Sequence, residues 1–211
     1  MKAPKPEMTS NIKPIEAGTI NAICCGLIDL GTQRTEWQGV EKDLPKIMLI
    51  FEVDETYEKD GQEYRRNAFA EFTFSLGSKA NLRKFLEGWV GKKSDDEWYE
   101  FDITELVGKP CLLNIVHTKP NAQGKVYANV ASAAPLVKGM QQLEVQGKTS
   151  IFDFECEDKD ELDEKMKSLP KFVADKIRQS KQYLGFSTPV SVPTEDKGET
   201  PINEHDDNLP F

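Results

Sequence analysis

Aromatic and basic side chains recur among polar residues, where they could recognise a flat and negatively charged ligand. Phe69 is the clearest case, because Asn67 and Glu71 flank it at the spacing of one strand face. An outward ring can stack on a nucleic-acid base, and Lys or Arg can pair with a phosphate. The candidates are Arg34, Trp37, Lys46, Tyr64, Arg65, Arg66, Phe69, Lys119, Lys125 and Tyr127. For Phe69, the alternative is a ring that only covers a loop at the rim of the fold.

Alternating hydrophobicity predicts the strands that must position these candidates. The predicted strands are residues 19–30, 46–53, 64–76, 110–118 and 125–134. Gly26 predicts a bulge or a sharp bend in the first strand, and Asp60-Gly61 predicts a tight hairpin turn between the second and the third. Residues 31–45 are expected to form a polar loop.

The third strand and the segment after it suggest how the core is built. One face of residues 64–76 is expected to be buried: Ala68, Ala70, Phe72, Phe74 and Leu76. Ser78 is expected to cap a helix that ends near Gly91 and buries an apolar stripe. Three strands, a helix and two further strands follow the order of an OB-fold, a five-stranded barrel with a helix between strands three and four. The predicted fold is therefore mainly β, with this barrel followed by a C-terminal helix and a disordered acidic tail.

The predicted barrel places several candidates in the loops with which OB-folds grip oligonucleotides. Arg34 and Trp37 fall in the polar loop after the first strand, and Lys119, Lys125 and Tyr127 flank the loop between the last two strands. Further cations occur on and after the predicted helix, namely Lys79, Arg83, Lys84, Lys92 and Lys93. These either form the solvated face of the helix or extend a track for phosphates.

Charge is distributed unevenly along the 211 residues, whose net charge is -9. Residues 1–150 hold 19 Lys and Arg against 21 Asp and Glu, whereas residues 151–211 hold 8 against 15. The first part can therefore still present a basic face. The expected units are a flexible arm (1–17), the barrel (18–150), an acidic segment with a helix from Pro170 to about Tyr183 (151–186), and a disordered tail (187–211).

The last six residues have the chemistry of a peptide ligand. They read Asp206-Asp207-Asn208-Leu209-Pro210-Phe211, an acidic stretch ending in an apolar tripeptide with a free carboxylate. A phenyl ring can fill a small apolar pocket, while an Arg or Lys of a partner binds the carboxylates. This stretch resembles the tail tip of bacterial single-stranded DNA-binding proteins, which implies recruitment of replication and repair enzymes.

Three internal segments carry a second and independent resemblance. Residues 81–89 (NLRKFLEGW), 108–115 (GKPCLLNI) and 127–130 (YANV) resemble a family of bacteriophage single-stranded DNA-binding proteins with an OB-fold. The resemblance covers about residues 18–186. It implies binding of single strands with little sequence preference during phage DNA replication, recombination and repair, in the cytoplasm of the host cell. The family supplies no agreed set of contact residues to carry over.

No enzymatic function is expected, because no P-loop, HExxH or GxSxG pattern occurs. The alternative of a magnesium-dependent nuclease would rest on Asp153, Glu155 and their neighbours. Cys24, Cys25, Cys111 and Cys156 lack zinc-site spacing, so reduced cysteines, no metal and no cofactor are expected. No run of residues is apolar enough for a membrane span.

Two other functions remain open at this point. One is a protein-interaction adaptor whose barrel binds no DNA, which the near-neutral charge of residues 1–150 keeps open. The other is a strand-annealing recombination mediator, which would use the same DNA-binding surface. The sequence leaves the oligomeric state open, with a dimer among the alternatives.

Overall fold

A computed structural model represents the protein and describes residues 13–37 and 39–186. All strands of these described residues belong to one sheet. Its strands are β1 (Gly18–Trp37), β2 (Val40–Lys59), β3 (Gln62–Thr73), β4 (Pro110–His117), β5 (Ala128–Ala134) and β6 (Ser150–Phe152). They run in the order β3-β2-β1-β4-β5 with antiparallel neighbours, and β6 pairs with β1 in parallel. The outermost strands of this order, β3 and β5, approach each other to within 8 Å between Cα atoms. The predicted mainly-β class is confirmed.

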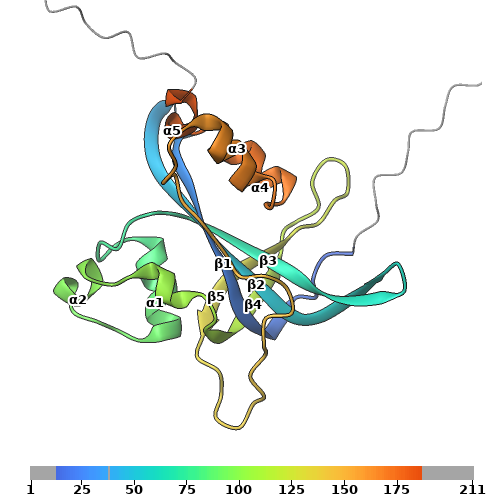
Figure 1. Ribbon diagram of the computed structural model, residues 1–211. Helices are drawn as coiled ribbons and strands as arrows, with labels where there is room; N and C mark the ends of the chain where they lie inside the picture. Colours follow the sequence, from blue (N-terminus) through green and yellow to red (C-terminus); the bar gives the residue numbers. More distant parts are fainter. Residues whose placement is uncertain (1–12, 38, 187–211) are drawn as a thin grey trace, which may run out of the picture.

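Helices occupy two separate places around this sheet (Figure 1). The first group is α1 (Asn81–Val90), α2 (Asp95–Tyr99) and the 3-10 helix η1 (Ile103–Leu106), all between β3 and β4 in sequence. The second group is α3 (Lys159–Met166), α4 (Lys171–Ile177) and α5 (Lys181–Gly185). In Figure 1, α1 and α2 lie on the left of the sheet, opposite the β2–β3 hairpin, and α3–α5 lie above it. No described helix is long and apolar enough to cross a membrane.

Strand β2 buries both of its faces, because a hydrophobic core lies on each side of the sheet. Leu49 and Phe51 belong to the first core, which α1 and η1 close. Met48 and Ile50 point the other way, into a second core with α3, α4 and α5. The alternation predicted for residues 46–53 is therefore confirmed, and the second core explains why its other face is apolar as well.

The turn signals of the sequence are also confirmed. Asp60 and Gly61 join β2 to β3 with φ angles of 54° and 74°, the left-handed pair that a two-residue hairpin turn requires. The register of β1 against β2 shifts between Cys24 and Gly26, which is the predicted bulge.

The polar loop expected at residues 31–45 is wrong, because this segment is strand. β1 continues to Trp37 and β2 begins at Val40, so the two strands form a long two-stranded arm. Helix α5 supports the arm: the Thr32 N–H donates to Gln182 Oε1 at 2.7 Å, and Lys181 Nζ lies 2.7 Å from Asp43 Oδ2. These partners are 150 and 138 residues away in sequence, and polar composition alone does not reveal them.

Two boundaries around the central helix also differ from expectation. Helix α1 begins at Asn81 after Ala80, which makes no side-chain capping bond, so Ser78 is not the cap. The apolar stripe that was predicted for this helix is buried, since Leu82 and Leu86 are each 0% exposed. Phe74 is 44% exposed rather than buried, because β3 already ends at Thr73.

The ends of the predicted units need correction as well. Ile15 is buried in the first core, so the loose arm expected for residues 1–17 does not include residues 13–17. β6 spans the expected boundary at residue 150. The single helix expected after Pro170 is two helices, because Ser180 caps α5 by accepting from the Tyr183 N–H. Part of the acidic run forms α3, capped by Asp158. Residues 1–12 and the tail 187–211 lie outside the described residues.

Candidate nucleic-acid interface

A hollow of about 1130 Å³ lies beside the β2–β3 hairpin and is closed on one side by the segment 13–16. We name it the hairpin hollow. Its lining includes Lys13, Tyr57, Lys59, Arg65, Arg66 and Phe69. The segment 13–16 is held in place by His117, whose Nε2 lies 2.7 Å from the Ile15 carbonyl oxygen. The hollow therefore combines aromatic and cationic side chains in one depression, the combination that binding of single strands requires.

Two tyrosines project from the hairpin at the edge of this hollow. Tyr57 and Tyr64 are direct cross-strand partners in the β2–β3 register. Their ring centroids are 5.8 Å apart with an interplanar angle of 32°, and the residues are 46% and 41% exposed. Such a pair offers an open aromatic surface on which a further ring could stack. Tyr64 was selected from the sequence, whereas Tyr57 was missed, although the hairpin turn predicts that the two face each other.

Phe69 does not stand free on an outer face. Its ring packs edge-on against Phe172 of α4, with the centroids 4.9 Å apart and an interplanar angle of 90°. Phe69 is half-buried against the second core and still lines the hairpin hollow, while Phe172 is 45% exposed. The partner of Phe69 is therefore a helix beside the second core, and not a loop at the rim of the fold, which was the alternative considered from the sequence.

The two arginines of the hairpin are largely engaged within the protein. Arg65 Nη1 donates to the Glu144 carbonyl oxygen at 2.6 Å and lies 4.0 Å from Glu52 Oε2. Arg66 Nη1 pairs with Glu55 Oε1 at 2.6 Å. Burial raises the pKa of Glu55, but hydrogen bonds from the Glu16 N–H and from Arg66 outweigh it and lower that pKa. The positive charge of the hollow is therefore mostly balanced by carboxylates.

The loop between β4 and β5 carries a second aromatic and cationic group. Lys125 Nζ lies 5.0 Å from the ring centroid of Tyr127, which is 47% exposed. Asn121 shapes the loop, because its side-chain oxygen accepts the N–H groups of Gln123 and Lys125 at 3.0 and 2.9 Å. Lys119 is exposed in the same loop. The expected grouping of Lys119, Lys125 and Tyr127 is present there, in the loop at the upper right of Figure 1.

The remaining candidates lie outside both the hairpin hollow and the loop between β4 and β5. Arg34 is on the β1–β2 arm, 3.5 Å from both Glu41 Oε2 and Asp43 Oδ1. A hydrogen bond from Lys181 is the main cause that lowers the pKa of Asp43. Lys46 lines a separate hollow at the other end of β3. Trp37 ends β1, but its side chain lies outside the described part of the protein, as do Asp206, Asp207, Asn208, Leu209, Pro210 and Phe211.

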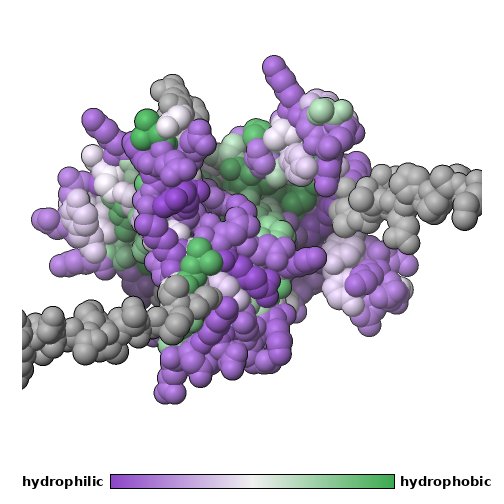
Figure 2. Space-filling model, turned by 90° about the horizontal axis from the view of Figure 1, so that it is seen from above, coloured by the Kyte–Doolittle hydropathy of each residue, from purple (hydrophilic) through white to green (hydrophobic). Residues whose placement is uncertain are grey.

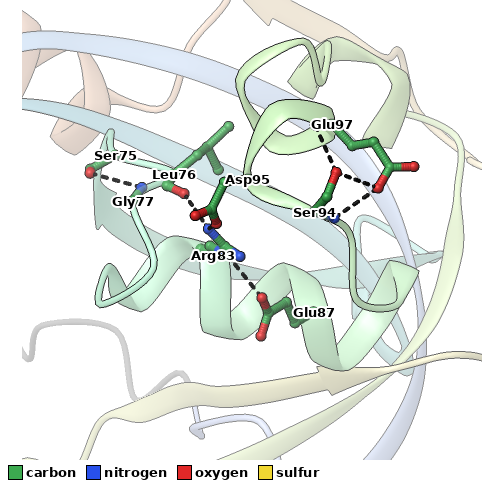
Figure 3. A network of polar contacts seen from close by, with 8 residues as sticks. All are labelled: Ser75, Leu76, Gly77, Arg83, Glu87, Ser94, Asp95 and Glu97. Atoms are coloured by element: carbon green, nitrogen blue, oxygen red, sulfur yellow. Dashed lines mark hydrogen bonds and ion pairs between the residues drawn. The ribbon is translucent and has the colours of Figure 1, made fainter.

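The central helix contributes one cation that is not a surface charge. Arg83 is 9% exposed and bonds to Glu87, Asp95 and the Leu76 carbonyl oxygen (Figure 3). The Ser94–Glu97 capping box at the start of α2 stands beside this network. Arg83 therefore joins α1 to α2 and to the loop after β3. It belongs neither to a solvated helix face nor to a track for phosphates, the two roles considered from the sequence.

The surface is mostly hydrophilic when the molecule is viewed from above, and its hydrophobic residues form small separate patches (Figure 2).

The four cysteines are free thiols, of which Cys24, Cys25 and Cys111 are buried. Burial raises the pKa of Cys24 and of Cys25 to about 12, so both are protonated and unreactive at neutral pH. Within the described residues, no cluster of His, Cys, Asp and Glu could hold a metal ion.

The sequence analysis did not identify Lys13, Tyr57 and Lys59, which line the hairpin hollow, or Phe172, which packs against Phe69.

Neither a protein-family model nor a curated protein matches the chain.

Proposed function

We propose that this protein binds single-stranded DNA through an OB-type barrel, with the hairpin hollow as the centre of its binding surface. The observation that carries the proposal is the open Tyr57–Tyr64 pair at the edge of a hollow that also contains lysine and arginine side chains. Stacking on such rings uses the face of any base, so binding should depend little on sequence. Bases paired within a duplex are stacked on each other and cannot reach these rings, so single strands should be preferred.

Two features of the sheet support the barrel. The order β3-β2-β1-β4-β5, with α1 between β3 and β4, corresponds to the strand order of an OB-fold opened between β3 and β5. These two strands approach each other at that point, as closure would require. On this arrangement, the β4–β5 loop with Lys125 and Tyr127 is one of the two loops that usually hold an oligonucleotide.

The proposed biological role is protection of single strands during DNA replication, recombination and repair, in the cytoplasm of a host cell. The proposed role of the tip Asp206–Phe211 is to recruit partner enzymes to the coated strand. One observation favours the adaptor alternative, namely that Arg65 and Arg66 are already paired with Glu52 and Glu55. For that reason, the DNA-binding experiment comes first.

The direct test is fluorescence anisotropy of labelled oligo-dT titrated with the full chain, in parallel with a duplex of the same length. We expect saturable binding of the single strand, weaker binding of the duplex, and affinity that falls as salt is added, because phosphate contacts release counterions. A mixed-sequence strand should bind about as well as oligo-dT. If oligo-dT and the duplex both fail to bind at low salt, the adaptor function replaces the proposal.

Removal of residues 204–211 tests the role of the tip. We expect the truncated chain to bind oligo-dT as well as the full chain or slightly more tightly, because acidic residues that compete with phosphates are lost. Capture of replication and repair proteins from a host lysate should be abolished, and deletion of Phe211 alone should cause most of that loss, because it removes the apolar anchor. The same partners captured by the truncated chain would contradict a docking role.

A further inference from the structure

A second hollow of about 660 Å³ lies between the end of β3 and the start of α1. We name it the β3–α1 hollow. Lys46 borders it from β2, where it pairs in register with Thr73 of β3. The other side is formed by the loop before α1, with Ser75, Ser78 and Lys79. Two ammonium groups and three hydroxyl groups therefore surround one depression.

The β3–α1 hollow differs from the hairpin hollow in its charge. Among the described residues that line it, only Glu71 carries a carboxylate, and this group forms an ion pair with Lys176 of α4. Neither Lys46 nor Lys79 has an ion-pair partner within the described residues. The hollow is therefore positively charged and rich in hydrogen-bond donors, which suits the oxygens of a phosphate group. The hairpin hollow, by contrast, offers rings and balanced charges.

The loop that forms one wall is held in place. The Ala80 N–H donates to the Gly77 carbonyl oxygen at 2.8 Å, and the Gly77 N–H donates to Ser75 Oγ at 3.4 Å. Arg83 reaches the Leu76 carbonyl oxygen while it is held by Glu87 and Asp95 (Figure 3). The hydroxyl groups of the loop are thus presented by a structured turn, which reduces the entropy lost when a ligand is bound.

Both hollows lie along β3. The hairpin hollow is lined by β3 residues 65–67 and 69, and the β3–α1 hollow is lined by residues 71–73. At about 3.3 Å per residue, the line from Arg65 to Thr73 is roughly 26 Å long. Between them, Phe172 and Lys176 of α4 contact Phe69 and Glu71. A strand that occupies both hollows must therefore pass beside α4.

We propose that the β3–α1 hollow is a phosphate subsite, in which Lys46 and Lys79 bind the backbone of the single strand whose bases stack at the hairpin hollow. This inference rests on the proposed function and adds to it that the two ends of β3 contact different parts of the DNA strand. The hairpin end binds its bases, and the end near α1 binds its phosphates. Only a strand long enough to reach past α4 can use both, so the contribution of the two lysines should depend on strand length.

The test compares full-length Lys46→Gln, Lys79→Gln and the double variant with Lys138→Gln. Lys138 is an exposed cation in the loop after β5 and lines neither hollow, so its loss changes net charge equally but leaves both hollows intact. Affinity for oligo-dT of about 4 and about 16 nucleotides, the range covered by one barrel, is measured over a tenfold range of salt. Thermal melting checks that each variant is folded.

With the longer strand, we expect each hollow variant to reduce the slope of log K against log salt by about 0.7, which is about a fivefold change across the salt range. The double variant should lose about twice as much, while Lys138→Gln keeps the slope of the unaltered chain. With the short strand, the variants and the unaltered chain should agree. Equal slopes for Lys46→Gln, Lys79→Gln and Lys138→Gln on the longer strand would overturn the subsite while leaving the proposed function intact. Failure of the unaltered chain to bind any strand would overturn both.

Discussion

Replacement of Glu52 by alanine is expected to lower the free energy of unfolding by about 3 kcal/mol, the scale for losing hydrogen bonds to a charged group. Glu52 is only 6% exposed. Its carboxylate accepts the N–H groups of Gln146 and Gly147 at 2.8 and 3.0 Å, and Arg65 lies 4.0 Å away. The alanine variant would leave these donors without their acceptor. It would also remove the contacts of residues 146 and 147 with β2, while Asn21 and Arg65 still donate to the carbonyl oxygens of Gln141 and Glu144.

Urea denaturation followed by circular dichroism measures this loss, with Glu58→Ala as the matched control. Glu58 lies on the same strand but is exposed, so its removal should change stability by no more than about 0.5 kcal/mol. Hydrogen exchange should increase at Gln146 and Gly147 in the Glu52 variant alone. Equal stability of the two variants would show that the carboxylate does not hold residues 146 and 147.

The same contacts explain why the sequence identified the arginines of the hairpin as candidates but did not reveal their partners within the protein. Arg65 and Arg66 occur among polar residues of an alternating strand, where an outward cation is the simplest expectation. Their partners are Glu144, from a distant loop, and Glu55, across the hairpin. We therefore expect Arg65→Ala to act mainly through stability rather than through the salt dependence of DNA binding.

Local patterns predicted the parts of the fold that local physics determines. Alternation placed Leu49 and Phe51 toward the first core, and Asp60-Gly61 marked a turn that needs two left-handed residues. The β1–β2 arm was missed, because its polar strands are stabilised by α5, far along the chain. Helix α3 was missed, because a short acidic helix depends on Leu162 and Met166 packing in the second core.

The second core also explains why the candidate site shifted toward the hairpin. Sequence alone placed Phe69 on an open face, whereas α4 covers part of that face with Phe172. The uncovered aromatic surface lies farther along the hairpin, at Tyr57 and Tyr64. Alternation identifies two faces of a strand, but whether a later helix covers the outer one depends on tertiary packing.

The double substitution Tyr57→Ala/Tyr64→Ala should weaken binding of oligo-dT by about 1–3 kcal/mol for each base that stacks there, or roughly 5- to 150-fold per base. The two rings are half exposed, and as a cross-strand pair they contribute only about 0.2–1 kcal/mol to folding. The variant should therefore remain folded. Neither ring carries a charge, so the slope of affinity against salt should stay as in the unaltered chain.

Two further variants make this result specific to stacking. Tyr57→Phe/Tyr64→Phe retains both rings and loses only the hydroxyl groups, one of which bonds to Gln62 at 2.7 Å, so it should restore most of the affinity. Tyr99→Ala removes a tyrosine that is 76% exposed on α2, on the opposite side of the sheet from the hairpin, and should bind as the unaltered chain does. Fluorescence anisotropy with oligo-dT at several salt concentrations gives both affinity and slope. If the double alanine variant binds as tightly as Tyr99→Ala, the bases stack elsewhere and the hairpin hollow is not the centre of the site.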